Sequence, residues 1–211
     1  MSWGASESGV GRAPAGRPVL TVVFTDIVGS TALIERLGDD RWVEVLSAHD
    51  DAVRSALRTH GGEEVKTTGD GFLAVFGDAA GAVRAGVLAR RLVAALRVPE
   101  VPEGLAIRVG AHSGPVVRRD GDVLGRTVHV ARRVAAAAAA GEVLVSSSVR
   151  LATGADEGLP TGSPRTLRFA GVSEPQVVFS VVPAGDGDGG ATVHVLDRTR
   201  RRATDAPGRT R

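Results

Sequence analysis

Residues 19–27 form a nine-residue run, VLTVVFTDI, in which β-branched and other apolar side chains fill nearly every position. Such a run is typical of a strand that is buried on both faces. A stretch with helical spacing, residues 29–62, follows directly and contains a break near Gly38. A buried strand that leads straight into helices predicts a mixed structure in which helices cover a sheet.

The rest of the body continues this alternation of strands and helices. Residues 63–76 predict a β-hairpin whose turn is the Gly-Asp-Gly of residues 69–71. Later segments predict a long amphipathic helix at 78–97, two strands that meet near Ser113–Gly114, an alanine-rich helix at 125–140, and strands at 141–146, 166–171 and 176–182. Helices that fall between strands and hairpins favour an α+β, ferredoxin-like βαβ sandwich.

The chain of 211 residues suffices for one domain with a tail at each end. We expect a disordered N-terminal tail at residues 1–18, a catalytic or binding body at 19–183, and a flexible basic C-terminal tail at 184–211. The net charge is +2, and because the two tails together carry +3, the body carries −1. This charge balance argues against nucleic acid binding by the body.

The absence of cysteine excludes disulfides, zinc-thiolate sites and thiol nucleophiles. No apolar run approaches the ~20 residues that are needed to span a bilayer. The first residues also lack the apolar segment of a signal peptide. We therefore expect no transmembrane segment and a cytoplasmic location.

The first candidate site lies in FTDIVGST, where Asp26 ends the predicted strand and Gly29, Ser30 and Thr31 open a helix. Free N–H groups at a helix N-terminus bind phosphate, and a glycine allows close approach of the backbone. A carboxylate beside such a nest is a natural ligand for a phosphate-bound Mg²⁺. The simpler alternative is that Ser30 or Thr31 is an ordinary N-cap and that Asp26 is a turn residue.

The second candidate site lies in VKTTGDGF. Asp70 occupies the predicted hairpin turn, and a hairpin next to the first strand would set Asp70 beside Asp26, where two carboxylates can hold two metal ions ~3.5–4 Å apart. Lys66, four residues earlier, is the only lysine of the chain, whereas the other 25 basic residues are arginines. A compact ammonium suits a pocket that offers one donor to one ring nitrogen, although a lone lysine at a strand edge is more often simply solvated.

The third candidate site lies in DGDVLGRTVHVARRV. Asp122 precedes the predicted helix, and His129 and Arg133 are four residues apart, so they share one helix face. An arginine on that face can neutralise charge that develops on a transferring phosphoryl group. The alternative is a surface helix with a solvated arginine.

Taken together, these motifs and IRVGAHSGPVV resemble the class III nucleotidyl cyclases, the catalytic domain of adenylyl and guanylyl cyclases, from about Val19 to about Val182. The resemblance implies a site built across a head-to-tail dimer of ferredoxin-like domains. It implies that Asp26, Asp70 and the carbonyl of Ile27 hold two Mg²⁺ or Mn²⁺ ions per site. We expect a homodimer with two equivalent sites, because one chain carries both kinds of site residue.

The resemblance also assigns roles around the nucleotide. The backbone of Gly29, Ser30 and Thr31 matches the phosphate-holding stretch, and Arg108 matches an arginine that contacts the phosphates. Lys66 and Asp122 match the lysine–aspartate pair that reads adenine, and Arg133 matches the arginine that stabilises the transition state.

The implied reaction is attack of the ribose 3′-hydroxyl on the α-phosphorus of ATP. Its products are cyclic AMP and pyrophosphate, which implies a role in intracellular signal transduction. The regulatory input is left open, and an unidentified regulatory partner is one candidate.

Two positions depart from the family pattern. His129 replaces an asparagine that orients the ribose, and we expect reduced turnover because a histidine ring is bulkier and can be charged. Ala170 stands where a phosphate-holding lysine often occurs, with Arg168 two residues away. These departures keep open a second reading, a non-catalytic nucleotide-binding module.

Two further readings are less favoured. The pair Lys66 and Asp122 argues against a guanylate cyclase. An RNA-binding ferredoxin-like domain needs exposed aromatic residues on its sheet, and the chain has five phenylalanines and no tyrosine.

Overall fold

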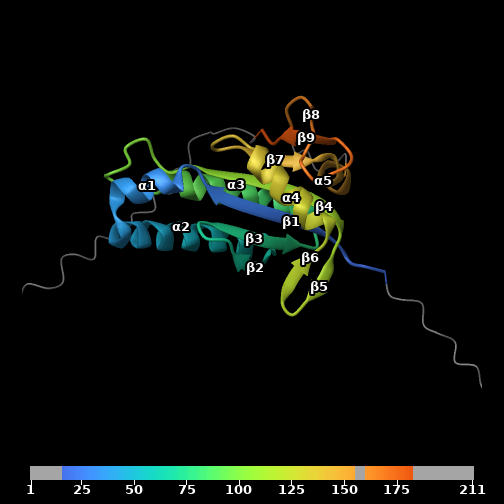
Figure 1. The fold of residues 1–211 in the computed structure, drawn as a ribbon, viewed down its shortest axis with the longest axis horizontal. Helices are drawn as coiled ribbons and strands as arrows, with labels where there is room; N and C mark the ends of the chain where they lie inside the picture. The colour runs from blue at the N-terminus through green and yellow to red at the C-terminus, as the bar shows by residue number, and fades with distance from the viewer. Residues whose placement is uncertain (1–15, 155–159, 183–211) are drawn as a thin grey trace, which may run out of the picture.

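The structure is a computed structural model that describes residues 16–154 and 160–182. Residues 1–15 of the predicted N-terminal tail and all of the predicted C-terminal tail therefore lie outside the described residues. The described part forms one mixed sheet with helices on both faces and a small separate hairpin (Figure 1). Within it no helix is both long and apolar enough to cross a membrane.

The main sheet has seven strands in the order β2-β3-β1-β4-β7-β9-β8. Their bounds are β1 Val19–Ile27, β2 Glu63–Thr67, β3 Gly71–Phe76, β4 Ile107–Pro115, β7 Val143–Ser146, β8 Arg165–Leu167 and β9 Gln176–Ser180. All neighbouring pairs are antiparallel except β4 and β7, which are parallel. The buried strand predicted at residues 19–27 is thus confirmed as β1, and it lies near the middle of the sheet.

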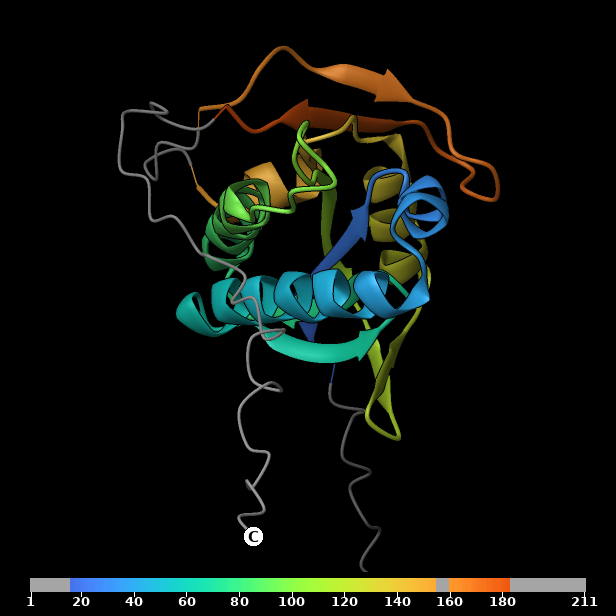
Figure 2. The ribbon, with the colours of Figure 1, turned by 90° about the vertical axis from the view of Figure 1, so that its left-hand side faces the viewer.

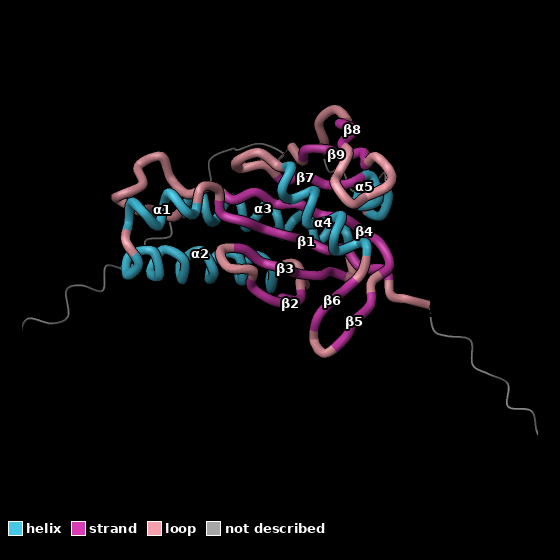
Figure 3. The backbone as a smooth tube through the Cα atoms, in the orientation of Figure 1, coloured by secondary structure: helices cyan, strands magenta, loops and turns pink. Residues whose placement is uncertain are grey.

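Helices cover both faces of this sheet, as Figure 3 shows in cyan against the magenta strands. Their bounds are α1 Ser30–Leu37, α2 Asp39–Thr59, α3 Ala79–Ala95, α4 Arg126–Ala137 and α5 Ser147–Ala152. The larger apolar core lies between the sheet and α1, α2 and α3, and it includes Val23, Ile27 and Ala74. The opposite face carries α4, whose Ala131 and Ala135 belong to a second buried cluster. The predicted α+β sandwich is confirmed, and so is the helix break near Gly38.

The two remaining strands, β5 (Val117–Arg119) and β6 (Asp122–Leu124), pair only with each other. This hairpin extends away from the body below the sheet in Figure 2. Val123 of β6 is buried in the cluster beneath α4, so the hairpin is anchored on the α4 face.

Two predicted strand boundaries are wrong. The strand expected at residues 166–171 ends at Leu167, as β8. The sequence suggested two strands that meet near Ser113–Gly114, but β4 runs unbroken through both residues. Gly114 pairs with Leu20 of β1, so the pairing with β1 holds β4 straight up to Pro115. The break comes at Val116, which is buried and donates its N–H to the carbonyl of Pro18.

The contact between α4 and the sheet depends on a glycine of β4. A methyl group on Gly110 would lie 2.1 Å from the backbone nitrogen of Ala135 and 2.3 Å from its Cα atom. Backbone atoms cannot move aside as a flexible side chain can, so there is no room for a side chain at this position. At Gly110, α4 therefore packs directly on the backbone of β4.

We expect Gly110→Ala to lower the free energy of unfolding by about 2–3 kcal/mol, because α4 would have to move away from the sheet. Gly77→Ala is the matched control, since a methyl group there meets no atom within 4 Å, and it should change stability by less than ~0.5 kcal/mol. Urea unfolding of both variants measures the difference. Equal stability of the two variants would contradict direct packing of α4 on Gly110.

Candidate active site

Asp26 takes its position from the strands on both sides of β1. In the antiparallel register Asp26 lies opposite Gly71 of β3 and opposite Arg108 of β4. Asp70 directly precedes Gly71, so the hairpin turn brings the second carboxylate to the same end of β1. The register therefore places the turn that carries Asp70 at the same end of β1 as the ion pair of Asp26 and Arg108.

Arg108 forms an ion pair with Asp26 across the strands. Its Nε and Nη2 atoms donate to the Oδ2 atom of Asp26 at 2.8 and 2.5 Å. Both side chains are about one-third exposed. A cation beside Asp26 lies where it can also contact an anionic ligand bound at this end of β1.

The turn after Asp26 leads into α1 through Gly29. Gly29 is the N-cap of α1, has a left-handed backbone with φ of 71°, and makes no side-chain capping bond. The alternative that Ser30 or Thr31 is the N-cap is therefore wrong, because both belong to the first turn of the helix. The side chain of Ile27 is buried in the core, so only its backbone can serve a ligand.

Two carboxylates at one strand end fit a magnesium-type site. Within residues 16–154 and 160–182 no three acidic or histidine side chains gather as ligands for a metal ion. Mg²⁺ is nevertheless usually held by only one or two carboxylates, because substrate phosphates and water complete its shell. Asp26 and Asp70 supply hard oxygen donors of this kind.

The single lysine pairs with the aspartate of the third motif. The Nζ atom of Lys66 on β2 donates to the Oδ2 atom of Asp122 on β6 at 2.5 Å. The Lys66 ammonium, together with the backbone N–H of Val123, holds the pKa of Asp122 below its ordinary value. Residues 56 positions apart in the chain thus form one donor–acceptor pair on the partly exposed surface.

The structure does not bring His129 and Arg133 to the other site residues. Both lie on α4 and are exposed. In the described part of the chain no hydrogen bond or ion pair of either side chain is found. Their neighbour Arg132 instead lines a pocket with Asp26 and Arg108.

This pocket has a volume of about 290 Å³ and lies between the end of β1 and α4. Its lining consists of Phe24, Thr25, Asp26, Thr68, Arg108, Arg132, Ala135 and Ala136. The sequence did not single out Thr68 or Arg132. The only local hint was their position in the motifs: Thr68 lies two residues before Asp70, and Arg132 lies directly before Arg133. Two arginines and one carboxylate give the pocket a net positive charge, which suits a phosphate.

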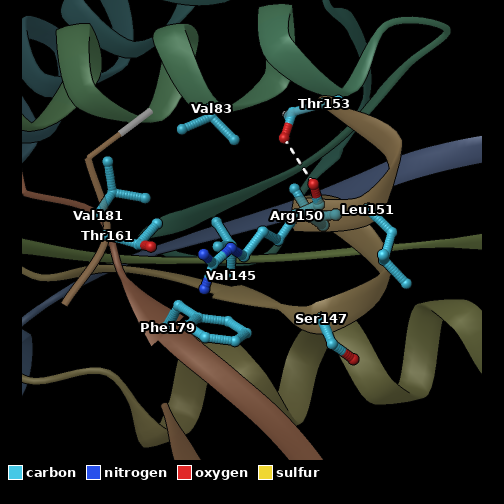
Figure 4. A pocket seen from close by; sticks show the side chains of 11 residues that line it. Val83, Val145, Ser147, Arg150, Leu151, Thr153, Thr161, Phe179 and Val181 are labelled. Atoms are coloured by element: carbon cyan, nitrogen blue, oxygen red, sulfur yellow. Dashed lines mark hydrogen bonds between the residues drawn. The ribbon is translucent and has the colours of Figure 1, made fainter. Parts of the chain in front are cut away.

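A second and larger pocket, of about 540 Å³, lies at α5 and β9, remote in the chain from the motifs (Figure 4). Four of its eleven lining residues are valines, and Arg150 is the charged residue of its lining. The guanidinium of Arg150 lies 4.5 Å from the centre of the Phe179 ring. None of the predicted site residues lines this pocket.

Comparison with known proteins decides the family. The model of the adenylate and guanylate cyclase catalytic domain matches residues 15–159, more than half of the chain. The chain belongs to this family. It is a class III nucleotidyl cyclase domain, as the motifs suggested.

The cyclase domain is similar to proteins of several bacteria. It is 35% identical over 130 residues to an adenylate cyclase of Streptomyces coelicolor, which covers 61% of this chain and 32% of that protein. It is also 35% identical over 135 residues to a serine/threonine-protein kinase of Myxococcus xanthus, which covers 63% of this chain and 16% of that protein. The chain thus spans less than a third of the length of these curated relatives.

Among solved structures, an adenylate/guanylate cyclase/hydrolase of Silicibacter pomeroyi matches with a TM-score of 0.68 and 28% identity. This match covers 81% of the present chain and all of the other. The catalytic core of a rhodopsin-guanylyl cyclase with converted specificity, in complex with ATPαS, matches with a TM-score of 0.71 and 24% identity. That match covers 79% of this chain and 97% of the other, and it shows the fold alone.

A partly buried polar cluster surrounds His112 of β4. The Nδ1 atom of His112 lies 2.8 Å from Oγ of Ser146 and 3.1 Å from Oγ of Ser148. Ser148 in turn accepts the N–H of Ser113 at 3.1 Å, which ties β4 to the start of α5. Burial, and to a smaller degree the charge of Arg126, lowers the pKa of His112 to about 4.

The low pKa of His112 predicts a pH dependence of stability. Below its ordinary pKa of about 6.5 the unfolded chain binds a proton on this histidine, whereas the folded chain stays neutral down to about pH 4. The folded state therefore loses stability as the pH falls through this window. We expect wild type to lose about 1–2 kcal/mol more than His112→Gln between pH 7 and pH 5. Urea unfolding at both pH values measures this difference, and parallel profiles of the two proteins would contradict it.

Proposed function

We propose that this cyclase domain converts ATP into 3′,5′-cyclic AMP and pyrophosphate at the interface of a head-to-tail homodimer in the cytoplasm, for intracellular signalling. The observation that carries the choice of ATP is the pair formed by Lys66 and Asp122. Adenine presents an acceptor at N1 and a donor amine at N6. Lys66 donates to the first and Asp122 accepts from the second.

Guanine reverses this polarity at the same edge of the base. Lys66 would face the N1–H donor and Asp122 the O6 acceptor, so both protein groups would lose their partners. Each mismatch of this kind costs about 1–3 kcal/mol when the group is desolvated. ATP is therefore the preferred substrate, and GTP a poor one.

The phosphate end of ATP belongs at Asp26. The pocket there carries Arg108 and Arg132, which together neutralise phosphate charge. Asp26, Asp70 and the carbonyl of Ile27 would hold two Mg²⁺ or Mn²⁺ ions. When bound, such ions help to deprotonate the ribose 3′-hydroxyl and neutralise charge on the α-phosphate and the leaving pyrophosphate. The N–H groups of Gly29, Ser30 and Thr31 serve the distal phosphates.

The distribution of these residues supports a dimer. Lys66 lies opposite Leu73, which lies opposite Phe24 of β1, so Lys66 and Asp26 are two strands apart in the sheet. His129 and Arg133 are exposed on α4, whereas the pocket at Asp26 is lined by Arg132. A second copy can bring its Arg133 to the phosphates held at Asp26, where the guanidinium stabilises charge in the transition state.

We expect Asp26→Ala and Asp70→Ala to lose at least ~100-fold in turnover, because each removes a ligand worth several kcal/mol in the transition state. The measurement is cyclic nucleotide production by the purified protein with Mn²⁺ and ATP, with GTP in parallel. Asp51→Ala, an exposed acid on α2, is the control and should keep wild-type turnover. Retained activity in either site variant would refute the two-metal assignment.

A second candidate function is a nucleotide-binding module without turnover. It is favoured by His129 and Ala170, which depart from the family pattern. This module would bind ATP in the same assay without releasing pyrophosphate.

Restoring asparagine at position 129 separates the two functions. If His129 is a tolerated substitute at the ribose, His129→Asn should raise turnover about 5–10-fold, the value of one well-placed hydrogen bond. The KM for ATP should change little, because the base and phosphate contacts are untouched. A fall in turnover would show instead that the histidine has its own role in this protein.

A further inference from the structure

The strand that carries Lys66 contains a β-bulge. The register of β2 with β3 shifts between Glu64 and Lys66, so Val65 is an extra residue. Glu64 lies opposite Ala74, and Lys66 lies opposite the next residue of β3, Leu73. β-Bulges change the direction of the side chains around them and are common beside active sites.

The bulge places Glu64 and Lys66 on opposite faces of the sheet. Directly opposed residues of an antiparallel pair share a face. Ala74 belongs to the core beneath α1, α2 and α3, whereas Leu73 belongs to the cluster beneath α4. Without a bulge, strict alternation would put Glu64 and Lys66 on one face. Only with the bulge does Glu64 face α2 while Lys66 faces the β5–β6 hairpin and Asp122.

An ion pair holds Glu64 on the α2 face. The Nε and Nη2 atoms of Arg54 on α2 donate to the two carboxylate oxygens of Glu64 at 2.9 and 3.2 Å. The same guanidinium lies 5.1 Å from the centre of the Phe72 ring on β3. Arg54 therefore contacts both strands of the hairpin that carries Lys66 and Asp70.

A matching ion pair holds Glu63 on the other face. Glu63 lies opposite Val75, a residue of the cluster beneath α4. The Nη1 and Nη2 atoms of Arg118 on β5 donate to its two carboxylate oxygens at 2.7 and 2.8 Å. A slip of one residue would move each glutamate to the face away from its arginine. The two pairs therefore specify the register of Glu63 and Glu64, the residues that precede the bulge.

We propose that Arg54 and Arg118 are positioning residues for base selection, because they hold Glu64 and Glu63 in the register with β3 that leaves Val65 as the extra residue before Lys66. This inference rests on the proposed reading of adenine by Lys66 and Asp122. Neither arginine is bonded to Lys66 or Asp122 in the described part of the chain. Both ion pairs are partly exposed, so their loss costs little stability and acts mainly on register.

The first test is the ratio of kcat/KM for ATP to kcat/KM for GTP. Arg54→Glu and Glu64→Arg should each lower this ratio about 5–10-fold, because Lys66 is no longer held beside Asp122. The double variant restores an ion pair of reversed polarity and should return the ratio to near its wild-type value. Arg118→Glu and Glu63→Arg form a second set with the same expected pattern.

A matched control comes from an ion pair elsewhere on the surface. Arg36 and Glu103 are paired at 2.8 Å with similar exposure and lie outside the hairpins. Arg36→Glu should leave the ratio unchanged. An equal fall in this control would show that the effect is a general one of surface charge, and would overturn the proposal.

The second test needs no turnover, because Lys66 is the only lysine. Reductive methylation with formaldehyde and sodium cyanoborohydride, the hydride donor, modifies amines, so its targets are Lys66 and the α-amino group. Mass spectrometry follows the rate at Lys66. Asp122→Asn gives the rate for an unpaired lysine. Arg54→Glu and Glu64→Arg should approach that rate, and the double variant should return to the slower wild-type rate.

The two tests separate the inference from the function on which it rests. Unchanged methylation of Lys66 in the single variants would overturn positioning by the ion pairs, whatever the activity shows. Faster methylation with an unchanged nucleotide ratio would show that the base is read elsewhere. That result would overturn both the selectivity role of the arginines and the proposed reading of adenine.

Discussion

The double pairing of β1, with β3 on one side and β4 on the other, determines where each group near Asp26 lies. Asp26 is opposite Gly71 and Arg108 in the two registers. A carboxylate, a second carboxylate in the adjoining turn and a guanidinium therefore meet at one strand end, although they come from three separate segments. A shift of either neighbouring strand by one residue would turn the partner side chain to the opposite face.

Glycine is required at two positions where backbone segments around Asp26 approach each other most closely. A Cβ atom on Gly71 would lie 2.0 Å from the carbonyl oxygen of Thr25, just before Asp26. Beyond the site, Gly110 admits α4 to direct contact with β4. The two glycines allow two different close contacts around the site. Gly71 lets β3 approach the end of β1, and Gly110 brings α4 over the pocket at Asp26.

Much of the fold follows from local patterns in the sequence. The apolar run of β1, the helix break at Gly38 and the hairpin around Asp70 were all predicted, because each depends on residues close in the chain. The short elements β6 and α5 were not predicted. A strand of three residues and a helix of six have too little periodicity to be recognised, and they form because of their packing against distant segments.

The family could be recognised from the sequence, and so could the residues on which the proposed chemistry rests: two carboxylates, one lysine and a glycine-containing turn, each in a recognisable local motif. The direction of Lys66 could not be predicted, because the segment EEVKT has no regular alternation and no signal of a bulge. It depends on contacts with distant segments. The pairing of β2 with β3, and ion pairs to α2 and β5, place Lys66 beside Asp122 on the α4 face. The local pattern of apolar and polar residues can indicate a strand. The register of that strand with its neighbours depends on residues that lie far away in the chain.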